Sequence, residues 1–436
     1  MLIRKTTGTV TVPAAPTWGN ITPPAEWTWT LPFAIQRHSQ TGAIRVDPTF
    51  DLEAYANVTE TGTSWVKMAS EGGSDSASGA DEAHAFATIH KALSYTSRSV
   101  VMVKAGTYSG YPSDGWNGGH PNASFKVKAY GGAVIITMDV TSALTWNLVG
   151  NHYEASYASN LASVYDFASP DSDGDATILV KAADAATVDS TPGSWFSTGG
   201  VIYVRTSDNR QPDTNIHCSV GSSNGYMTYG VTQYLEGLTF WGGPSPFNAN
   251  LAGNGLKLYC KNCNFKYSSS VAGTDIFVVT GGGGEVGLQG CVAARGNGDC
   301  FKMLFSGAYV SNLFMIDCIG RYGGLPGNTN ANGYSRHGPG STVGINCEFH
   351  HTYGPSVKDV NDATLTWLLG CYGHDSLVQA ENFGTDNATT MWLDTCRSVM
   401  AGTIDVSVGN VAARLFYHNM TPAVPAYSGP GTIAAY

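Results

Sequence analysis

Between residues 238 and 396, the same pattern of hydrophobic and polar positions returns at a nearly constant interval. The pattern is clearest around six cysteines that align in one column: Cys263, Cys291, Cys318, Cys347, Cys371 and Cys396. Their spacings are 28, 27, 29, 24 and 25 residues, and Leu238 takes the same place 25 residues before Cys263. Aligned segments of roughly 26 residues predict a solenoid, in which each turn buries its apolar face against its neighbours.

Residues around each column position alternate between apolar and polar, which is the two-residue period of a β-strand. The second position after the column is mostly apolar or small: Phe240, Phe265, Ala293, Gly320, Phe349, Gly373 and Ser398. We therefore expect this position to face the interior, and the first and third positions to face solvent. The residue before the column, such as Gly237, Asn262 or Asp317, tolerates the left-handed conformation and predicts a tight bend.

The cysteines are predicted to be small buried side chains of the coil rather than reactive thiols. Nine cysteines cannot all pair within one chain, and unpaired thiols indicate synthesis in a reducing cytoplasm. The C-x-x-C spacing of Cys260 and Cys263 keeps zinc as an alternative, although no second spaced pair accompanies it. The acidic run "DSDGD" at 171–175 is compatible with calcium, but a solvated loop is favoured. No metal and no cofactor is predicted.

The segment "SGADEAHAFATIHKALSYTSRSVVMVKAGTYSG" predicts a cap, which a solenoid needs because its end turns leave strand edges unpaired. Ala85, Phe86, Ile89 and Leu93 follow helical spacing, and the apolar strand "VVMV" comes next. The motifs "FATIHKAL" and "VKAGTY" resemble the first turn of right-handed parallel β-helix proteins of the pectate-lyase-like superfamily. The predicted fold is all-β: a right-handed parallel β-helix with an N-terminal capping helix and a small antiparallel β insertion.

The repeat does not extend over the whole chain, and five segments are predicted. Residues 1–54 are rich in proline and outside the repeat, so they are interpreted as an attachment or linker segment. Residues 55–139 hold the capping helix and the first turns, and 140–225 form an antiparallel insertion because "PGSWFSTGGVIYVRTSD" has hairpin-like alternation. The regular coil is expected over 226–420, followed by a C-terminal tail at 421–436.

Composition narrows the classes of function. The 53 glycines, 22 tyrosines and 10 tryptophans, with only 13% charged residues, are typical of a turn-rich β protein. A net charge of −10 without clusters of Lys and Arg argues against a nucleic-acid partner. No 18-residue apolar stretch and no signal-peptide core occur, so the sequence predicts neither membrane insertion nor secretion by a leader.

Ionisable and aromatic side chains gather on the later predicted turns. Because stacked strands lie about 4.8 Å apart, a column of the alignment becomes a stripe on the surface. The predicted stripe contains Arg321, Glu348, His350, Tyr372, His374 and Arg397. A second group opens the following turns or lies between them: Asp299, Ser335, Arg336, His337, Asp359, Asp362, Asp375 and Asp386. A single aspartate in such turns often satisfies backbone amides, but the clustering favours a functional face.

Residues 297–376, with "NGDCF", "GYSRHGPGSTVGINCEFHHTYGPSVKDVND" and "GCYGHDS", resemble the body of bacteriophage tailspike proteins. This resemblance implies a homotrimer that recognises its host by binding bacterial surface polysaccharide and commonly depolymerises it. It also implies a protein made in the bacterial cytoplasm and located in the virion, attached to the tail or baseplate through the N-terminal segment.

Three functions stay open at this point. The favoured one is a glycoside hydrolase acting on capsule or lipopolysaccharide, which needs two carboxyl groups about 5–10 Å apart. Its candidate catalytic residues are Asp359, Asp362, Glu348 and Asp375, and its candidate substrate-binding residues are Arg321, Arg336, His337, His350, Tyr372, His374 and Trp241. The second is a polysaccharide lyase with His337, His350 or His374 as base and an arginine stabilising the anion. The third is a spike that binds a glycan or serves as a shaft without catalysis.

Overall fold

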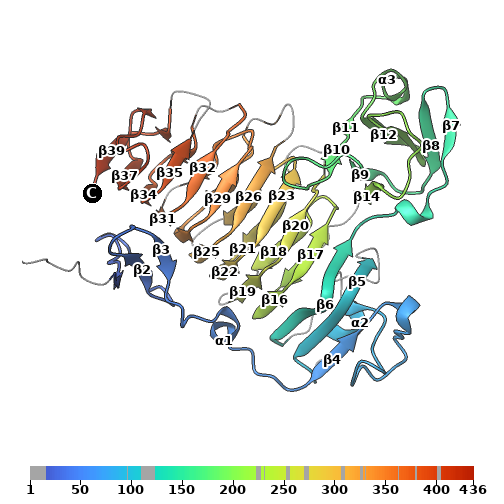
Figure 1. Cartoon of the computed structure of the whole chain (residues 1–436), viewed down its shortest axis with the longest axis horizontal. Coiled ribbons are helices and arrows are strands. Elements are labelled where there is room, and N and C mark those ends of the chain that lie inside the picture. The colour runs from blue at the N-terminus through green and yellow to red at the C-terminus, as the bar shows by residue number, and fades with distance from the viewer. Residues whose placement is uncertain are drawn as a thin grey trace, which may run out of the picture.

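The computed structural model describes residues 16–95, 97–109, 123–221, 227–229, 231–251, 256–269, 274–305, 310–324, 328, 330–361, 363–378, 381–399 and 404–436. These residues form a parallel β-solenoid of about ten turns with about 26 residues each, which confirms the predicted solenoid. Figure 1 shows the turns stacked side by side, with the C-terminus at one end of the stack.

Three parallel sheets form the walls of the solenoid. Sheet one runs through β4 (Thr63–Val66), β5 (Val100–Ser109), β6 (Phe125–Thr137), β16 (Gln233–Glu236), β19 (Leu256–Lys261), β22 (Gly284–Gln289), β25 (Ser311–Ile316), β28 (Gly340–Ile345), β31 (Thr364–Leu369), β34 (Thr390–Asp394), β37 (Arg414–His418) and β39 (Thr432–Ala435). Sheet two contains β17 (Leu238–Trp241), β20 (Asn264–Lys266), β23 (Val292–Gly296), β26 (Ile319–Gly323), β29 (Glu348–His350), β32 (Tyr372–His374) and β35 (Arg397–Val399). Sheet three contains β15 (Met227–Tyr229), β18 (Phe247–Leu251), β21 (Phe277–Gly281), β24 (Phe301–Phe305), β27 (Tyr334–His337), β30 (Val357–Asp359), β33 (Phe383–Thr385), β36 (Val406–Val408) and β38 (Tyr427–Ser428).

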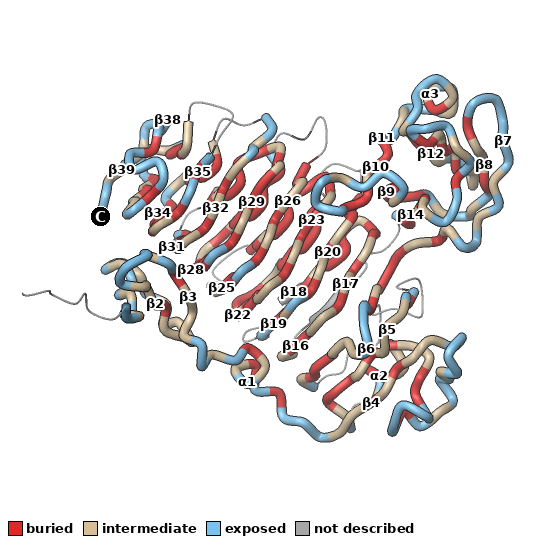
Figure 2. Tube along the Cα trace, in the orientation of Figure 1, coloured by how far each residue is buried: buried red, intermediate tan, exposed pale blue. Residues whose placement is uncertain are grey.

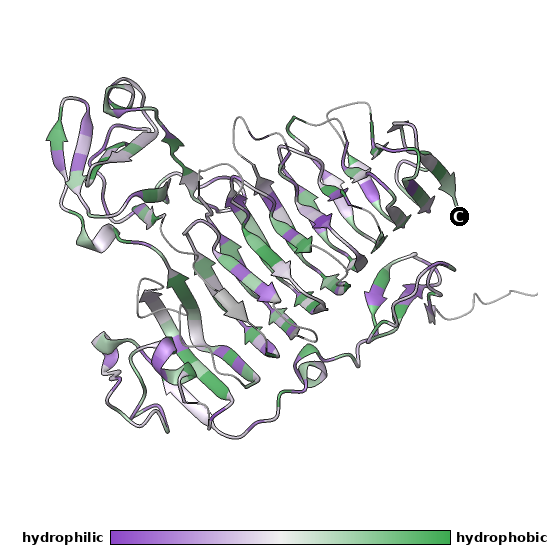
Figure 3. Ribbon diagram, turned by 180° about the vertical axis from the view of Figure 1, so that it is seen from behind, coloured by the Kyte–Doolittle hydropathy of each residue, from purple (hydrophilic) through white to green (hydrophobic). Residues whose placement is uncertain are grey.

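The register between turns is the one that the cysteine column predicts. Phe240 pairs with Phe265, which pairs with Ala293, and these inward side chains lie in the central core. The six column cysteines are buried free thiols, and several donate to backbone carbonyls, such as Cys291 Sγ to Cys260 O at 3.3 Å. Figures 2 and 3 show the alternation of buried with less buried, and hydrophobic with hydrophilic, residues along the strands.

The bend between sheets one and two is also as predicted. All seven residues before the column have φ between 52° and 71°: Gly237, Asn262, Gly290, Asp317, Asn346, Gly370 and Thr395. Glycine and asparagine enter this left-handed region at low cost, which explains their frequency in the column. At each bend, a single residue separates the end of a sheet-one strand from the column residue. The chain therefore passes from sheet one to sheet two within one turn.

The helices of the described residues are short, and none of them has the length and apolar character to cross a membrane. The capping helix α2 (Ile89–Leu93) begins at Thr88, whose hydroxyl accepts from Lys91 N at 3.1 Å. Ile89 and Leu93 pack into the core as predicted, but Phe86 precedes the helix. Its N–H donates to Trp65 O at 2.8 Å, so this residue is held in a strand-like conformation and the helix is shorter than its sequence pattern predicts.

The strands of the predicted insertion are antiparallel in all but one of their pairings. One sheet contains β7 (Asn147–Val149), β8 (His152–Ser156), β11 (Val180–Lys181), β12 (Ser194–Thr198) and β13 (Val201–Arg205), and another contains β9 (Leu161–Asp166), β10 (Thr177–Ile178) and β14 (Ile216–Val220). The β12–β13 hairpin turns at Gly199 and Gly200, with φ of 58° and 83°, which a two-residue hairpin loop requires. With α3 (Ala185–Ser190), the insertion projects from the side of the solenoid (Figure 1).

Residues 16–56 pack along the outside of sheet one. They contain β1 (Trp18–Asn20), β2 (Ile35–His38), β3 (Ile44–Val46) and α1 (Leu52–Ala56), and Figure 1 shows them running from the C-terminal turns back toward β16. Trp27 lies 5.8 Å from the ring of Trp367, and Phe33 lies 5.4 Å from that of Phe314. These residues are therefore part of the folded body, while the attachment role predicted for residues 1–54 stays a prediction.

Candidate functional site

A loop of the insertion covers part of the stripe predicted on sheet two. Asp175 is fully buried, and its carboxylate binds Lys266 Nζ at 2.5 Å and Arg321 Nε at 2.8 Å. Asp171 in the same loop pairs with Arg295. The run at 171–175 is exposed at residues 172–174, as a solvated loop is, but the carboxylates at its two ends neutralise cations of the solenoid. Arg321 is bound to the protein itself, so its predicted role in substrate binding is not supported by its position.

Four predicted residues of the stripe do come together. His374 Nε2 lies 2.9 Å from Glu348 Oε1, and its Nδ1 lies 2.6 Å from Asp375 Oδ2. The Tyr372 ring stacks on the His374 ring at 4.1 Å, and Arg397 lies over Tyr372. The hydrogen bond from His374 lowers the pKa of Asp375, so Asp375 is ionised and is a poor proton donor for hydrolysis.

A second bend column lies four residues after the cysteine column. The backbone φ lies between 51° and 67° at all five residues of this column: Tyr267, Arg295, Tyr322, His351 and Asp375. Because this bend interrupts the strand alternation, His351 lies beside His350, with 2.6 Å between their Nδ1 atoms. These five residues also align in the sequence, but because they are of different types, the sequence did not predict that they share the left-handed conformation.

A groove of about 440 Å³ separates the insertion from this bend column. Thr177 to Lys181 form its wall on the insertion, and Arg295, Tyr322, His351 and Tyr353 are among its residues on the solenoid. The Arg295 guanidinium stacks 3.6 Å from the centroid of the Tyr322 ring. Flat aromatic and guanidinium surfaces of this kind suit contact with sugar rings. Trp241 is not among them, because it packs against Phe167 at 5.2 Å under the insertion.

Two predicted site residues point into the solenoid. Arg336 and Asp359 are adjacent on paired strands β27 and β30, and both are fully buried. Arg336 donates to backbone carbonyls, including Pro339 O at 2.8 Å. Burial raises the pKa of Asp359 to about 7. Neither side chain is positioned to contact a polysaccharide, so the assignment of Asp359 to catalysis and of Arg336 to binding is corrected. Asp362 lies outside the described residues.

The neighbouring outward positions of sheet three form a pocket of about 420 Å³. At its base, Lys302 Nζ lies 3.2 Å from Asp275 Oδ2 and 3.4 Å from Asp299 Oδ2. The two carboxylates come from successive turns, since Phe277 pairs with Phe301 and each aspartate lies two residues before its phenylalanine. The solenoid therefore holds two carboxyl groups around one ammonium group at the base of an open pocket.

The two carboxyl groups have different surroundings. Asp299 accepts hydrogen bonds from Asn332 N at 2.7 Å, from Asn332 Nδ2 at 2.9 Å and from Ser335 Oγ at 2.6 Å. Asp275 accepts from Asp299 N at 3.0 Å and from Lys302. Burial, followed by the nearby Asp299 charge, raises the pKa of Asp275 to about 6. Such a difference between paired carboxyl groups is what acid and base roles require.

Other polar residues complete the pocket: Asn328, Asn330, Asn332, His337, Lys358 and Glu381. Burial and the positive charge of Lys302 lower the pKa of His337, so its imidazole is neutral near pH 7. Of the residues predicted to bind substrate, His337 is thus the one that lines this pocket. Lys358 is the second lysine of this pocket, after Lys302, and its Nζ lies 4.0 Å from Glu381 Oε1.

Asp275 was missed in the sequence, although a signal for it exists. A three-residue motif recurs, in which an acidic or amide residue is followed by any residue and then by Phe or Tyr. It occurs as Asp275-Ile-Phe277, Asp299-Cys-Phe301, Asn332-Gly-Tyr334 and Glu381-Asn-Phe383. The aromatic residues of this motif are inward partners on sheet three, so the polar residues align on the outside. An alignment on these aromatic residues, rather than on cysteine, identifies the pocket.

Comparisons with known proteins add little to this geometry. No family model and no curated protein sequence matches the chain. A solved structure described as a glycoside hydrolase is similar with a TM-score of 0.49 and 10% identity, covering 85% of this chain and 97% of that one. A tailspike of Acinetobacter baumannii bacteriophage AP22, in complex with A. baumannii capsular saccharide, is similar with a TM-score of 0.20 and 12% identity, covering 77% of this chain and 64% of that one. Both TM-scores are below 0.5, so neither likeness assigns a reaction or a ligand to this chain.

Proposed function

We propose that this protein hydrolyses glycosidic bonds of a bacterial surface polysaccharide in the pocket on sheet three. Asp275 is assigned as the general acid and Asp299 as the base or nucleophile. The observation that carries the proposal is the carboxyl pair itself: two aspartates of successive turns that both contact Lys302 Nζ, at 3.2 and 3.4 Å, within a pocket of about 420 Å³.

The surroundings of the pair support these roles. A general acid must carry its proton near the working pH, and burial with the neighbouring charge raises the pKa of Asp275 to about 6. Asp299 accepts hydrogen bonds from Asn332 and Ser335, which fix the orientation of its carboxyl group beside Asp275. Glycoside hydrolysis needs one carboxyl group that donates a proton and a second that acts as base or nucleophile.

The remaining pocket residues support a polysaccharide as substrate. Lys302 and Lys358 already contact carboxylates of the pocket, whereas the side-chain amides of Asn328, Asn330 and Asn332 can bind hydroxyl groups. The resemblance of residues 297–376 to tailspikes supports capsule or lipopolysaccharide as the source of such a polymer.

The test is digestion of a panel of purified capsule and lipopolysaccharide preparations, followed at once by reducing-end assay and near-ultraviolet absorbance. We expect new reducing ends without absorbance for the wild type. Asp299→Asn should lower turnover by about 10²–10⁴-fold while preserving glycan binding. Asp359→Asn is the matched control, because this aspartate lies inside the solenoid and should leave turnover unchanged. Full turnover by Asp299→Asn would reject the proposed pair.

A lyase is the second candidate, and one observation favours it. His337 lines the same pocket as Lys302, and its lowered pKa keeps the imidazole neutral, as a base requires. A lyase would produce unsaturated sugars, so absorbance would accompany each new reducing end. His337→Ala would then abolish both products and absorbance, whereas the hydrolase proposal requires this variant to keep producing reducing ends.

The setting of this activity also remains a proposal. The tailspike resemblance supports a homotrimer in the virion, attached to the tail or baseplate through residues 1–54. Binding without cleavage is supported by the groove between the insertion and the solenoid, where Tyr322, Tyr353 and Arg295 offer flat surfaces to sugars. Light scattering of the purified chain tests the trimer, and glycan binding without products would favour the adhesin.

A further inference from the structure

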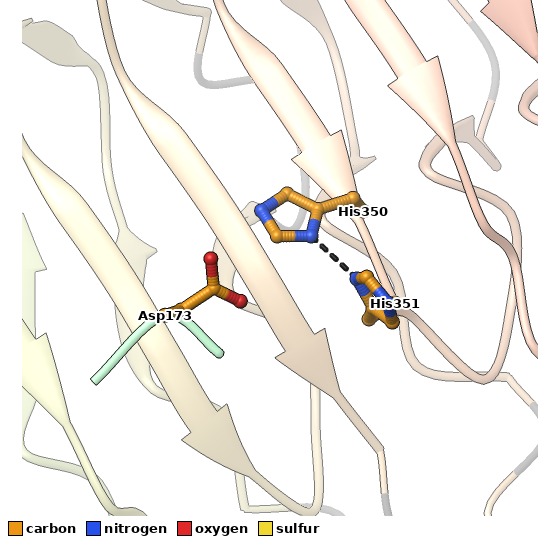
Figure 4. Close-up of side chains that lie close together, drawn as sticks. All are labelled: Asp173, His350 and His351. Carbon is orange, nitrogen blue, oxygen red and sulfur yellow. Dashed lines mark hydrogen bonds between the residues drawn. The ribbon is translucent and has the colours of Figure 1, made fainter. Parts of the chain in front are cut away.

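Three potential metal ligands meet where the insertion touches the solenoid. Asp173 belongs to the insertion loop, and His350 and His351 lie at the end of strand β29. One ligand atom from each lies within 4.8 Å of the others. Figure 4 shows the carboxylate of Asp173 facing the two imidazole rings across the gap between the elements. Segments far apart in the sequence thus bring together one oxygen and two nitrogen donors.

The two histidines are in direct contact with each other. Their Nδ1 atoms lie 2.6 Å apart, below the usual range for a hydrogen bond between nitrogen and an acceptor. His350 is only 5% exposed, and no hydrogen bond reaches its Nε2 atom within the described part of the chain. The two imidazoles and the carboxylate each offer one donor atom to a single cation, which would replace the hydrogen bond between the two rings.

Arg321 is the positive group that competes with a metal ion for Asp173. Its strong contact is with the buried Asp175, through Nε at 2.8 Å, whereas its Nη1 lies 3.9 Å from Asp173 Oδ1. Asp175 also binds Lys266 at 2.5 Å, so this one carboxylate serves two cations. A metal ion at Asp173 would therefore replace a long contact with Arg321 rather than a short one.

We propose that Asp173, His350 and His351 bind a divalent transition-metal ion, with Zn²⁺ as the best fit. Imidazole nitrogen and carboxylate oxygen are common zinc ligands, and three protein ligands leave a fourth position for water or another ligand. The ion would join the insertion to the solenoid beside the groove that His351 also lines. This site is separate from the acid pocket and does not depend on the proposed hydrolysis.

A competing set of donors shares His350 but is already occupied. Glu348, His350 and His374 also bring their ligand atoms within 4.8 Å. However, His374 contacts Glu348 through Nε2 and Asp375 through Nδ1, so neither of its nitrogen atoms is available without breaking a contact. The Asp173 set is therefore the one proposed, and variants of the two carboxylates separate the alternatives.

The test uses the full-length chain, stripped with a chelator and titrated with zinc chloride by calorimetry. We expect one Zn²⁺ per chain. Asp173→Asn and His351→Ala should each weaken binding by more than the roughly 10–100-fold cost of losing an outer-shell partner. His84→Ala is the matched control, since it removes an exposed histidine that pairs with Asp81 at 2.8 Å elsewhere on the chain. It should bind zinc as the wild type does.

Two further measurements keep the result interpretable. Circular dichroism of each variant confirms that it is folded, and visible absorption of the cobalt-loaded protein reports ligation directly, because the d–d bands change when a ligand is lost. Loss of binding in Glu348→Gln with normal binding in Asp173→Asn would overturn the assignment. Absence of zinc binding by the folded wild type would overturn the site itself. Asp299→Asn should retain zinc whether or not it retains turnover.

Discussion

Two regions of the same sheet contain carboxylates and cations, yet their environments are opposite. On the outside of sheet three, Asp275 and Asp299 contact Lys302 in an open pocket. On the inside, at the next position along the neighbouring strands β27 and β30, Arg336 and Asp359 are fully buried. Because strand side chains alternate between faces, one position decides whether a carboxylate meets solvent or the core.

The two regions also differ in how their carboxylates are satisfied. Asp299 accepts three hydrogen bonds, whereas neither oxygen of Asp359 has a hydrogen-bond partner within the described part of the chain. A buried polar group without partners destabilises the fold in its charged form. A carboxylate on a turn of the solenoid is therefore a candidate site residue only if its strand position faces outward and neighbouring groups hydrogen-bond to it.

The strongest test of the comparison is the pH dependence of turnover. Asp275 must be protonated to act as the acid, so turnover should fall as the pH rises above about 6, where its carboxyl group ionises. Asp275→Asn should lower the rate by about 10²–10⁴-fold and remove this alkaline limb. The pH profile of kcat/KM for both proteins measures it. A variant with the wild-type limb would show that another group titrates.

The next effect concerns the inward residues that hold the pocket in place. Phe301 is fully buried, lies 5.8 Å from Phe277 and precedes Lys302 on strand β24. Phe301→Ala should reduce the free energy of unfolding by about 3–5 kcal/mol through loss of burial and creation of a cavity. Leu304→Ala on the same strand is the control, because Leu304 is 43% exposed and should cost about 0.5 kcal/mol or less. Denaturant titration separates the two, and equal costs would contradict the assigned faces.

The smallest expected effect is on stability through Asp359. Its pKa is raised to about 7 in the folded protein, so its contribution to stability is present at low pH and is lost as the pH rises through about 7. Between about pH 5 and about pH 8 this loss amounts to about 2–3 kcal/mol. Asp359→Asn cannot ionise and should not show that loss in thermal or denaturant unfolding.

A matched variant makes this last measurement specific. Asp386 lies one turn further and is only half-buried, so Asp386→Asn should preserve the difference in stability between the two pH values. If Asp359→Asn keeps the wild-type pH dependence, Asp359 is not the titrating interior group. If it abolishes turnover in a folded protein, the distinction between the two regions is lost.

The sequence by itself determined the repeat, the bend and the filling of the core. Cysteine, phenylalanine and glycine recur at fixed positions because every turn solves the same packing problem against the next one. Left-handed bends need residues such as Gly290 and Asn346, so this column could be predicted from residue type alone. The hairpin at Gly199 and Gly200 is a local feature of the same kind.

Only the tertiary structure decided which polar residues meet. Asp175 comes from the insertion and binds Arg321 across 146 positions of sequence, a pairing that no local pattern contains. Asp359 follows the same turn signals as the outward aspartates, but the register of its strand directs it inward. The apolar residues that pack the core recur within every turn, so the local sequence predicts them. A site depends instead on the face of the strand that each residue occupies and on segments that fold onto it from elsewhere in the chain.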